Sequence, residues 1–332
     1  MTALPSRTLG DLSVSALGVG AMVLSPGMYG EIDDETGEAA VRAAVEAGAT
    51  LVDTSDGYGA DGHNERLVGR ALAPVRDQVV IATKFGMRIP EGEPGHRFPV
   101  GLEFGELAVT GDPRLVRGYA EQSLRGLGTD RIDLYYPHFP DPEIPVEDTV
   151  GAVAELIEAG TVRHLGISNV DAATLRRAHA VHPVSAVQTQ WAMWHRPDPD
   201  LLQAADELGV GIVAWSPLGS GFLTGAVSGL AEGDFRNNID RFAHLATNND
   251  RYAPVRSIAE ELGITPAQLA LAWLLHQHPH VVPIPGSRTP AHIVENLDAA
   301  RVHLGDDELA RVDRALAEFA PQGTVDVFGG TS

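Results

Sequence analysis

The sequence contains no cysteine among its 332 residues. This absence excludes disulfide bonds, thiol nucleophiles and thiolate metal sites, so catalysis would have to use other side chains. Residues 1–7 form neither a charged-then-apolar signal nor an amphipathic transit peptide. The longest stretch without formal charge, Pro266 to Ser287, is interrupted by Gln, His and Pro and would make a poor membrane span. We therefore expect a cytoplasmic protein with no membrane partner.

Basic residues are also scarce. The chain has 24 Lys and Arg against 45 Asp and Glu, which gives a net charge of −21, and no basic block interrupts this excess. The negative electrostatic potential that this charge produces would repel nucleic acid and anionic membrane surfaces, so neither is expected as the main partner. A local phosphate site remains compatible with it, because a few Arg side chains and helix N-termini can bind phosphate within an acidic protein.

Apolar runs alternate with helix-like segments along the chain. Eight runs with little internal alternation predict strands buried on both faces of a parallel sheet: Leu17 to Met22, Thr50 to Asp53, Val79 to Lys84, Ile132 to Tyr135, Val162 to Ile167, Ser185 to Gln188, Gly211 to Trp215 and Val281 to Ile284. Segments with helical periodicity lie between them and are followed by Gly, the expected helix stop: Asp34 to Ala47, Pro113 to Leu127, Val146 to Ala159 and Pro199 to Leu208.

This alternation predicts the architecture. About eight strand–helix units in roughly 300 residues match an α/β fold of the (β/α)8 TIM-barrel type, whose active site lies at the C-terminal ends of the strands. We expect one such domain over residues 1–332, with a short hairpin at Ser6 to Val14 closing the barrel floor. A doubly wound sheet is the alternative, but it predicts a Gly-x-Gly-x-x-Gly loop. Gly18-Val19-Gly20 lacks the third glycine, and Gly219 to Gly225 has its last glycine one position late.

Side chains that can hold or move a proton stand at three of the predicted strand ends. Asp53 and Tyr58 lie at and after the second strand, Lys84 ends the third, and His138 follows the fourth. Each has a simpler interpretation alone: a turn former, a loop anchor, a solvated strand-end charge and a structural histidine. Together, at the ends of neighbouring strands, they are typical of an active site.

Several motifs occur in the order found in one family, and with them the chain resembles the aldo-keto reductase superfamily, including bacterial members related to potassium-channel β subunits. The motifs are Asp53-Thr54-x-x-x-Tyr58-Gly59 with Asn64-Glu65, Ala82-Thr83-Lys84, Ile132 to His138, Gly166-Ile167-Ser168-Asn169, Ser216-Pro217-Leu218-Gly219-x-Gly221, and Ile284 to Arg288 with Glu295-Asn296. The resemblance implies a (β/α)8 barrel with extra loops and helices at its C-terminal face, which binds NADPH without a Rossmann fold.

The resemblance also assigns roles to the four residues. Reduction of an aldehyde or ketone needs a proton donor at the carbonyl oxygen, and Tyr58 would be that donor. A nearby cation favours phenolate, so Lys84 is expected to lower the pKa of Tyr58 from its ordinary value of about 10. Asp53 would hold Lys84 in place. His138 would orient the carbonyl and share in proton delivery.

Cofactor-binding residues follow from the same resemblance. Ser168, Asn169 and Gln190 would meet the nicotinamide carboxamide, and Trp215 would stack on the nicotinamide ring. Ser216, Leu218 and Ser220 match the loop that wraps the pyrophosphate, for which a plain Gly-rich turn is the alternative. The segment expected to hold the adenosine phosphate comprises Gly286, Ser287, Arg288, His292, Glu295 and Asn296.

Two of these positions depart from the family pattern. Many members carry Lys where this chain has Gly286 and Arg where it has His292, so two fixed positive charges are missing. Arg288 can still bind a 2′-phosphate through its planar fork. NADPH is therefore the expected cofactor, with NADH as a possible second one.

The substrate is expected to be a small-molecule aldehyde or ketone. By the family pattern its pocket would involve the regions of Tyr29, Phe85 to Thr110, Phe139 and Gly225 to Asp250, and the second of these, rich in Pro and Gly, predicts an irregular loop. We expect no metal site, since His276-x-His278-x-His280 lies before the last strand with no acidic neighbour in sequence. A redox-sensing module that binds NADP(H) with little turnover is the alternative function, and the oligomeric state stays open.

Overall fold

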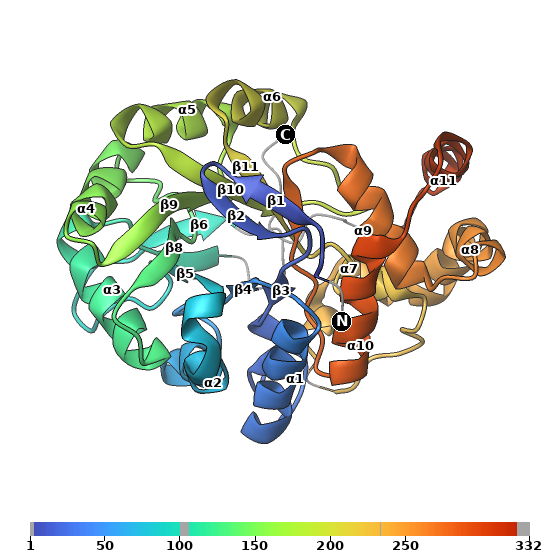
Figure 1. Cartoon of the computed structure of the whole chain (residues 1–332), viewed down its shortest axis with the longest axis horizontal. Coiled ribbons are helices and arrows are strands. Elements are labelled where there is room, and N and C mark those ends of the chain that lie inside the picture. Colours follow the sequence, from blue (N-terminus) through green and yellow to red (C-terminus); the bar gives the residue numbers. More distant parts are fainter. Residues whose placement is uncertain (1–2, 100–105, 233, 324–332) are drawn as a thin grey trace.

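Eight parallel strands form a barrel in the computed structural model, which describes residues 3–99, 106–232 and 234–323 (Figure 1). The strands pair in chain order: β3 (Val19–Gly20), β4 (Leu51–Asp53), β5 (Val80–Phe85), β8 (Ile132–Pro137), β9 (Val162–Ser168), β10 (Val184–Gln190), β11 (Gly211–Trp215) and β12 (Val281–Pro283). The predicted (β/α)8 class is confirmed, and each predicted strand has a counterpart within about two residues of its predicted ends.

The seam between the first and last barrel strands is closed by backbone hydrogen bonds. Gly18 N donates to Pro283 O at 3.0 Å, and Gly20 N donates to Pro285 O at 3.2 Å. A Cβ atom at Gly20 would lie 2.8 Å from Ile284 O, and one at Gly286 would lie 2.5 Å from Gly20 O. Glycine is needed at both positions because the two segments approach backbone to backbone.

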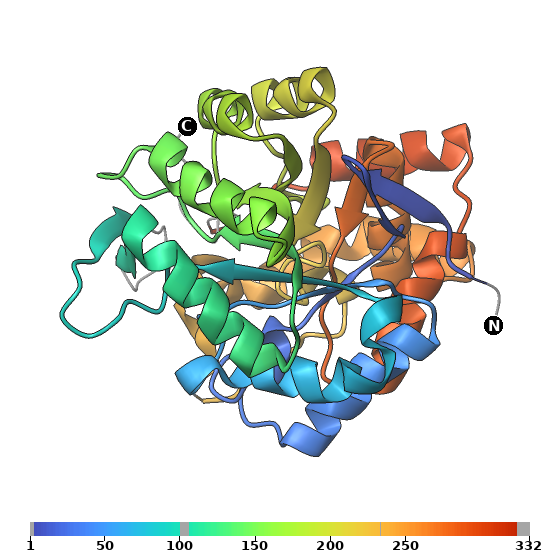
Figure 2. The same ribbon diagram turned by 60° about the vertical axis from the view of Figure 1, so that its left-hand side comes forward.

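Helices surround the barrel on its outside (Figures 1 and 2). Most of them connect successive strands: α1 (Asp34–Glu46), α2 (His63–Leu72), α3 (Pro113–Leu127), α4 (Val146–Glu158), α5 (Ala172–Val181), α6 (Pro199–Leu208) and α9 (Pro266–Gln277). Helix α10 (Pro290–Asp298) follows the last strand, β12. Three more, α7 (Asp240–Ala243), α8 (Leu245–Glu261) and α11 (Asp306–Glu318), are additions to the basic unit. None of the helices in the described residues is long and apolar enough to cross a membrane.

Local signals account for the helix ends. The side chain of Asp112 accepts a hydrogen bond from Arg114 N at the start of α3, next to Pro113 in the first turn. Gly128 ends this helix in the left-handed conformation at φ 62°, and Gly209 ends α6 at φ 67°. Both helices have the predicted bounds because a capping Asp, a first-turn Pro and a terminal Gly mark them in the sequence.

A hairpin of β1 (Ser6–Leu9) and β2 (Leu12–Ser15) covers the N-terminal ends of the barrel strands, as predicted (Figure 1). Leu9 is fully buried and belongs to the apolar cluster inside the barrel together with residues of β4, β5, β8, β10, β11 and β12. The guanidinium of Arg7 donates to the carbonyl oxygens of His278 and Val281 at 2.7 Å and of Leu275 at 2.5 Å. The floor hairpin is thereby joined to the end of α9 and the start of β12.

A second hairpin follows β5. Strands β6 (His96–Pro99) and β7 (Glu106–Val109) pair antiparallel, and in Figure 2 this turquoise segment projects at the left. The expectation of an irregular loop in this region is therefore wrong for these residues. His96 lies 2.7 Å from Asp141, which also accepts a hydrogen bond from Gly111 N at 2.8 Å. Contacts with a distant loop fix the segment, and its Pro- and Gly-rich sequence gives no sign of them.

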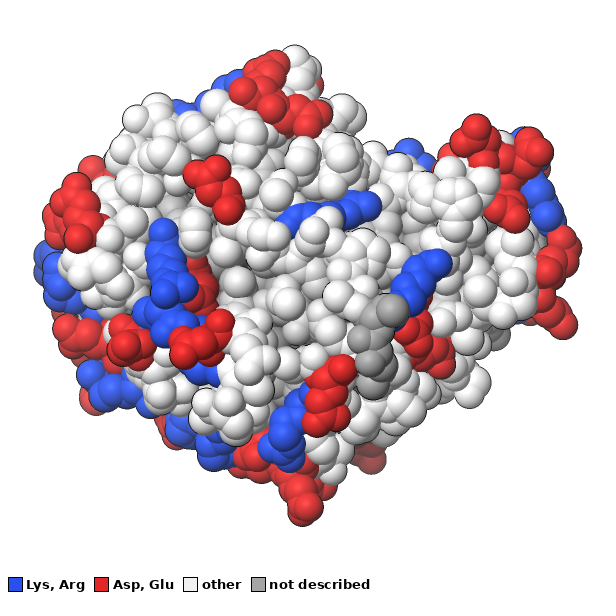
Figure 3. Space-filling view, viewed as in Figure 1, with Lys and Arg blue, Asp and Glu red and all other residues white. Residues whose placement is uncertain are grey.

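Charges of both signs are mixed on the face seen in Figure 3. Acidic and basic side chains alternate around its periphery, and its centre is largely uncharged. The excess of acidic residues is thus spread out on this face and forms no continuous patch.

Candidate active site

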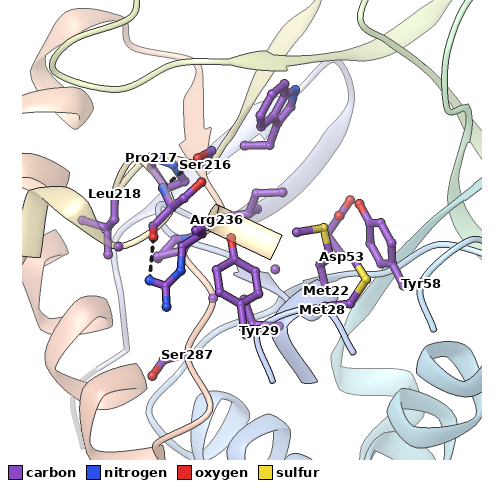
Figure 4. Close-up of a pocket in the computed structure, with 18 of the residues that line it drawn as sticks. Met22, Met28, Tyr29, Asp53, Tyr58, Ser216, Pro217, Leu218, Arg236 and Ser287 are labelled. Atoms are coloured by element: carbon purple, nitrogen blue, oxygen red, sulfur yellow. Dashed lines mark hydrogen bonds between the residues drawn. The ribbon is translucent and has the colours of Figure 1, made fainter. Parts of the chain in front are cut away.

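A cavity of about 760 Å³ lies at the C-terminal ends of the barrel strands. Residues from strand ends line one part of it, including Asp53, Ser168 and Trp215, and residues 284–289 and 292 line another. Figure 4 shows Tyr29, Tyr58 and Arg236 among the side chains around it, which come from loops far apart in the sequence. The cavity therefore occupies the end of the barrel at which the sequence predicts an active site.

Lys84 forms the centre of the polar group at the base of this cavity. Its Nζ donates to Asp53 Oδ1 at 2.5 Å, to the Thr54 carbonyl at 2.9 Å and to the Tyr58 hydroxyl at 3.2 Å. The lysine side chain is only 1% exposed, so its charge is neutralised by these partners and not by water. The side chain of Gln188 donates to the second carboxylate oxygen of Asp53 at 2.8 Å and fixes this anion in turn.

The pKa values of these groups follow from burial and from their partners. Burial alone would lower the pKa of Lys84, but Asp53 and Tyr58 together raise it, so the amine stays cationic. Burial raises the pKa of Tyr58, and the attraction of Lys84 offsets this only in part. The expectation that Lys84 brings the pKa of Tyr58 below its ordinary value is therefore not met, because the desolvation of the phenolate outweighs the cation. Tyr58 is held as a neutral proton donor.

His138 faces Tyr58 across the same part of the cavity. The two rings meet edge to face with their centroids 5.6 Å apart, and the imidazole stacks on Phe139 at 4.9 Å. Burial and the charge of Lys84 hold the pKa of His138 well below its usual range, so the ring is neutral. Its Nδ1 lies 3.0 Å from the Ser55 hydroxyl, which leaves Nε2 as the nitrogen available to a bound molecule.

The structure brings together most of the predicted cofactor residues. The cavity is lined by Ser168, Asn169, Trp215, Ser216, Leu218, Ser220, Gly286, Ser287, Arg288 and His292. Gln190, Glu295 and Asn296 are not among its lining residues, whereas Gln188, which we did not single out, is. Gln188 and Gln190 have the same orientation on β10, but Gln188 pairs with Ser168 and lies level with Asp53.

The loops after β9 and β11 carry unusual backbone conformations. Four non-glycine residues among the described ones have positive φ, and three of these, Asn169, Ser216 and Ser220, line the cavity at φ 57°, 50° and 53°. Such conformations cost free energy and persist where the surrounding structure demands them, often at ligand sites. Asn169 also accepts a hydrogen bond from Trp215 Nε1 at 3.1 Å, which fixes the indole at the cavity wall.

Arg236 is a cavity residue that sequence reasoning missed. Its Nη1 donates to the Ser220 carbonyl at 3.1 Å, its Nε and Nη2 bind Asp234, and its guanidinium lies 5.1 Å from the ring centre of Tyr29 (Figure 4). The cation thus spans two loops on one side of the cavity. The residue lies in the Gly225 to Asp250 region expected near the substrate, but no strand end or motif marked it.

The remaining wall near Tyr58 is largely apolar. Met22 and Met28 lie between Tyr29 and Tyr58 in Figure 4, and Met87, Leu107 and Phe139 also line the cavity. Lys84 is neutralised by Asp53, and the cavity-lining arginines are Arg236 and Arg288. This wall suits an uncharged group with apolar substituents.

The structure gives a reason for the glycine at position 286, where many members of the family carry Lys. Because the backbone of Gly286 touches that of Gly20, a lysine there would displace the seam of the barrel. Arg288 lines the cavity at this end and lies 3.4 Å from the Glu31 carbonyl through Nη1. Helix α10 begins two residues later, and its N-terminus favours an anion.

The histidine cluster before β12 does not join this site. Its middle member, His278, lies 2.9 Å from Asp206 on α6, an acidic partner that the sequence did not reveal. Within residues 3–99, 106–232 and 234–323 no group of three or more His, Asp or Glu side chains is arranged to hold a metal ion.

Comparisons with known proteins agree with this geometry. The Aldo/keto reductase family matches residues 16–317. Among similar solved structures, the glycerol dehydrogenase AKR11B4 from Gluconobacter oxydans is 27% identical, with 96% of this chain and 97% of that one covered and a TM-score of 0.80. An aldo/keto reductase from Klebsiella pneumoniae in complex with NADP and acetate is 27% identical, over 98% and 99% of the chains, at a TM-score of 0.72.

A second aldo-keto reductase structure from Klebsiella pneumoniae, in complex with NADPH, is 26% identical over the whole of both chains, with a TM-score of 0.71. The family match covers most of the barrel and all four polar residues at its C-terminal end. The chain belongs to the aldo/keto reductase family and is an oxidoreductase.

Proposed function

We propose that this chain reduces an aldehyde or ketone to the alcohol with NADPH, and that Tyr58 is the proton donor. The observation that carries the proposal is the arrangement of Asp53, Lys84, Tyr58 and His138 at the base of one cavity, with the Lys84 ammonium 3.2 Å from the Tyr58 hydroxyl. A neutral phenol beside a buried cation is suited to protonate a developing alkoxide.

The cavity residues fit a nicotinamide dinucleotide phosphate. The lining extends from Tyr58 and His138 past the strained Ser216 and Ser220 to Arg288 and the start of α10. Such a molecule has an aromatic ring at one end and phosphates toward the other, and the cavity offers an indole near the first and guanidinium groups near the second. Similar aldo-keto reductases are described in complex with NADP or NADPH.

The proposed contacts follow from these positions. Trp215 would stack on the nicotinamide, while Ser168, Asn169 and Gln188 would meet its carboxamide, with Gln188 in place of the predicted Gln190. Ser216, Leu218, Ser220 and Arg236 would hold the pyrophosphate. Arg288 would bind the adenosine 2′-phosphate through its planar fork. When bound, the cofactor supplies the hydride that the carbonyl carbon accepts.

The polypeptide handles the proton. Tyr58 donates its phenolic hydrogen to the carbonyl oxygen as negative charge develops there, and the Lys84 ammonium stabilises the phenolate that remains. Asp53 keeps Lys84 in position through the 2.5 Å contact. The Nε2 of His138 donates a second hydrogen bond to the same oxygen and orients the carbonyl. Met22, Met87 and Phe139, which line the same cavity, would exclude water from this oxygen.

Loss of the Tyr58 hydroxyl tests the proposal. With purified protein and a panel of aromatic, aliphatic and dicarbonyl substrates, we expect Tyr58→Phe to lower kcat by at least about 100-fold. The affinity for NADPH, measured by quenching of tryptophan fluorescence, should change by less than about twofold, because the hydroxyl contributes little to cofactor binding. Tyr252→Phe, which alters a buried tyrosine outside the cavity, is the matched control and should keep its turnover.

Two outcomes would count against this function. Equal turnover by Tyr58→Phe and the unaltered protein would remove Tyr58 from the chemistry. Tight NADPH binding with no turnover on any carbonyl would favour a redox-sensing module over a reductase.

A further inference from the structure

His138 is linked to a buried carboxyl group through one hydroxyl. The Ser55 Oγ lies 3.0 Å from His138 Nδ1 and 3.1 Å from Asp56 Oδ1, and it accepts a hydrogen bond from Gly57 N at 3.1 Å. Ser55 is fully buried and Asp56 is 4% exposed. Ser55 and Asp56 therefore form a buried relay that reaches His138 at the wall of the cavity.

A hydroxyl has one hydrogen to donate and two lone pairs to fill, which leaves two complete arrangements of this relay. If Asp56 is ionised, Ser55 donates to the carboxylate and His138 carries its proton on Nδ1. If Asp56 is protonated, its hydroxyl donates to Ser55, Ser55 donates to Nδ1, and the histidine proton lies on Nε2. The Gly57 amide occupies the remaining lone pair of Ser55 in both cases.

Only the second arrangement places a hydrogen on Nε2 of His138, so that the ring can donate the second hydrogen bond to a carbonyl oxygen in the cavity. We propose that Asp56 and Ser55 are positioning residues that determine which ring nitrogen of His138 bears the proton, and thereby couple carbonyl reduction to the protonation of Asp56. The inference rests on the proposed reductase function. It adds a way in which pH regulates carbonyl reduction, through the tautomer of the neutral His138 ring and not through the charge of that ring.

The surroundings of Asp56 favour its protonated form. Burial and the neighbouring carboxyl of Glu65 raise the pKa of Asp56 to about 7, against smaller opposing contributions from Ser55 and the backbone of Gly86 and Arg88. Within the described residues its Oδ2 atom has no partner with full hydrogen-bond geometry, so the backbone of Gly86 and Arg88 offsets the effect of burial only weakly. The other titratable groups that interact with it are Tyr58 on its own loop, Tyr119 of α3 and Tyr135 of β8.

These neighbours do not titrate in the same range. Burial raises the pKa values of Tyr58, Tyr119 and Tyr135 above the ordinary value, so all three are neutral. The pKa of His138 lies well below its usual range, and that of Lys84 is raised. Burial also raises the pKa values of Asp53 and Glu65. A change of activity around neutral pH would therefore come from one of three carboxyl groups, Asp53, Asp56 or Glu65, and its loss in an Asp56 variant but not in a Glu65 variant would assign it to Asp56.

The pH profile of kcat/KM for carbonyl reduction is the first test. In the unaltered protein we expect kcat/KM to fall by about tenfold per pH unit above about pH 7, as the donor tautomer is lost. Asp56→Asn, in which a neutral amide replaces the protonated carboxyl, should remove this inflection between about pH 6 and about pH 9. Ser55→Ala should remove it as well and lower kcat/KM on the acid side, because Nδ1 loses its partner.

Glu65→Gln is the matched control, since it removes a second buried carboxyl group nearby. It should keep the inflection and move it to lower pH, because the repulsion that raises the Asp56 pKa is gone. If Glu65→Gln abolished the inflection while Asp56→Asn kept it, the relay would be wrong.

The tautomer of His138 can be observed without turnover. Nitrogen-15 NMR of the unaltered protein, with the ring assigned through its own backbone, should show the proton on Nε2 below about pH 6 and on Nδ1 above about pH 8. The same tautomer at both pH values would overturn the relay even in an active reductase. A change of tautomer in a protein without turnover would instead support the relay and count against the proposed function.

Discussion

Lys84 shows at the scale of one residue how the site depends on a buried charge. Replacement by Met keeps the length of the side chain but removes the ammonium, so Tyr58 loses its electrostatic support and Asp53 loses its buried partner. We expect Lys84→Met to lower kcat by at least about 100-fold. An uncompensated buried carboxylate also costs about 3–5 kcal/mol of unfolding free energy.

Thermal or denaturant unfolding beside the activity assay would separate the two effects of Lys84→Met. Tyr58→Phe leaves the ion pair intact and should unfold like the unaltered protein, which makes it the control for stability. A Lys84→Met variant with unchanged stability would mean that the pair with Asp53 contributes nothing to the fold.

Arg288 is the residue on which a preference for NADPH over NADH depends. A charged hydrogen bond to a phosphate contributes about 1.5–3 kcal/mol, so Arg288→Met should lower kcat/KM with NADPH by about 10-fold or more. The value with NADH should hardly change. Arg301→Met, at an arginine outside the cavity, serves as the control. A ratio of catalytic efficiencies near one in the unaltered protein would show that Arg288 does not select the cofactor.

Single residues also show where sequence reasoning reaches its limit. That Asp53, Tyr58, Lys84 and His138 lie together was predictable because each stands at a strand end or in the loop after one, where the barrel brings side chains together. Gln188 and Gln190 point to the same face of β10, and only the register against β9 separates them. That register depends on contacts between strands, which the sequence of one strand does not encode.

At the scale of elements, helix α2 packs closely on α3 at Gly69. A Cβ atom at Gly69 would lie 2.3 Å from Leu127 O, whereas one at Gly118 within α3 would meet nothing within 4 Å. Gly69→Ala should therefore destabilise the protein by about 1–3 kcal/mol through overpacking. Gly118→Ala should instead stabilise it by about 0.5–1 kcal/mol, because alanine favours the helix. Denaturant unfolding checks the opposite signs, and equal effects would contradict the packing argument.

The ends of elements were predictable to different degrees. Helices α3 and α6 matched their predicted bounds because capping residues stand at both ends. The β6–β7 hairpin was not predicted, because Pro and Gly suppress the alternation that indicates a strand. The contact of His96 with Asp141 joins it to the loop after β8, and such long-range contacts leave no local pattern.

For the whole molecule, Arg7 connects the start of the chain to the last barrel unit. Its three hydrogen bonds to Leu275, His278 and Val281 lie at the floor, opposite the cavity. We expect Arg7→Met to lower the unfolding free energy by about 2–4 kcal/mol, because three partly buried carbonyls lose a charged donor. At a temperature where the protein stays folded, kcat should not change. Melting and initial rates check both expectations.

Arg42→Met is the control for this variant, because it removes only an exposed pair with Glu38 and should cost no more than about 0.5 kcal/mol. If the chain is one domain, as we propose, both variants should unfold in a single transition. Two separate transitions in Arg7→Met would mean that the floor hairpin is not part of the cooperative unit.

The position of sulfur in the molecule makes the cavity its oxidation-sensitive part. Without cysteine, methionine is the only sulfur-containing residue, and three of the five methionines, Met22, Met28 and Met87, line the cavity. Peroxide converts a thioether into a polar sulfoxide, so mild treatment should raise KM for apolar carbonyls before the fold is affected, and methionine sulfoxide reductases should reverse it. Oxidative stress would then affect this enzyme at the methionines of its substrate pocket. In most thiol-bearing proteins, by contrast, cysteine is the residue attacked.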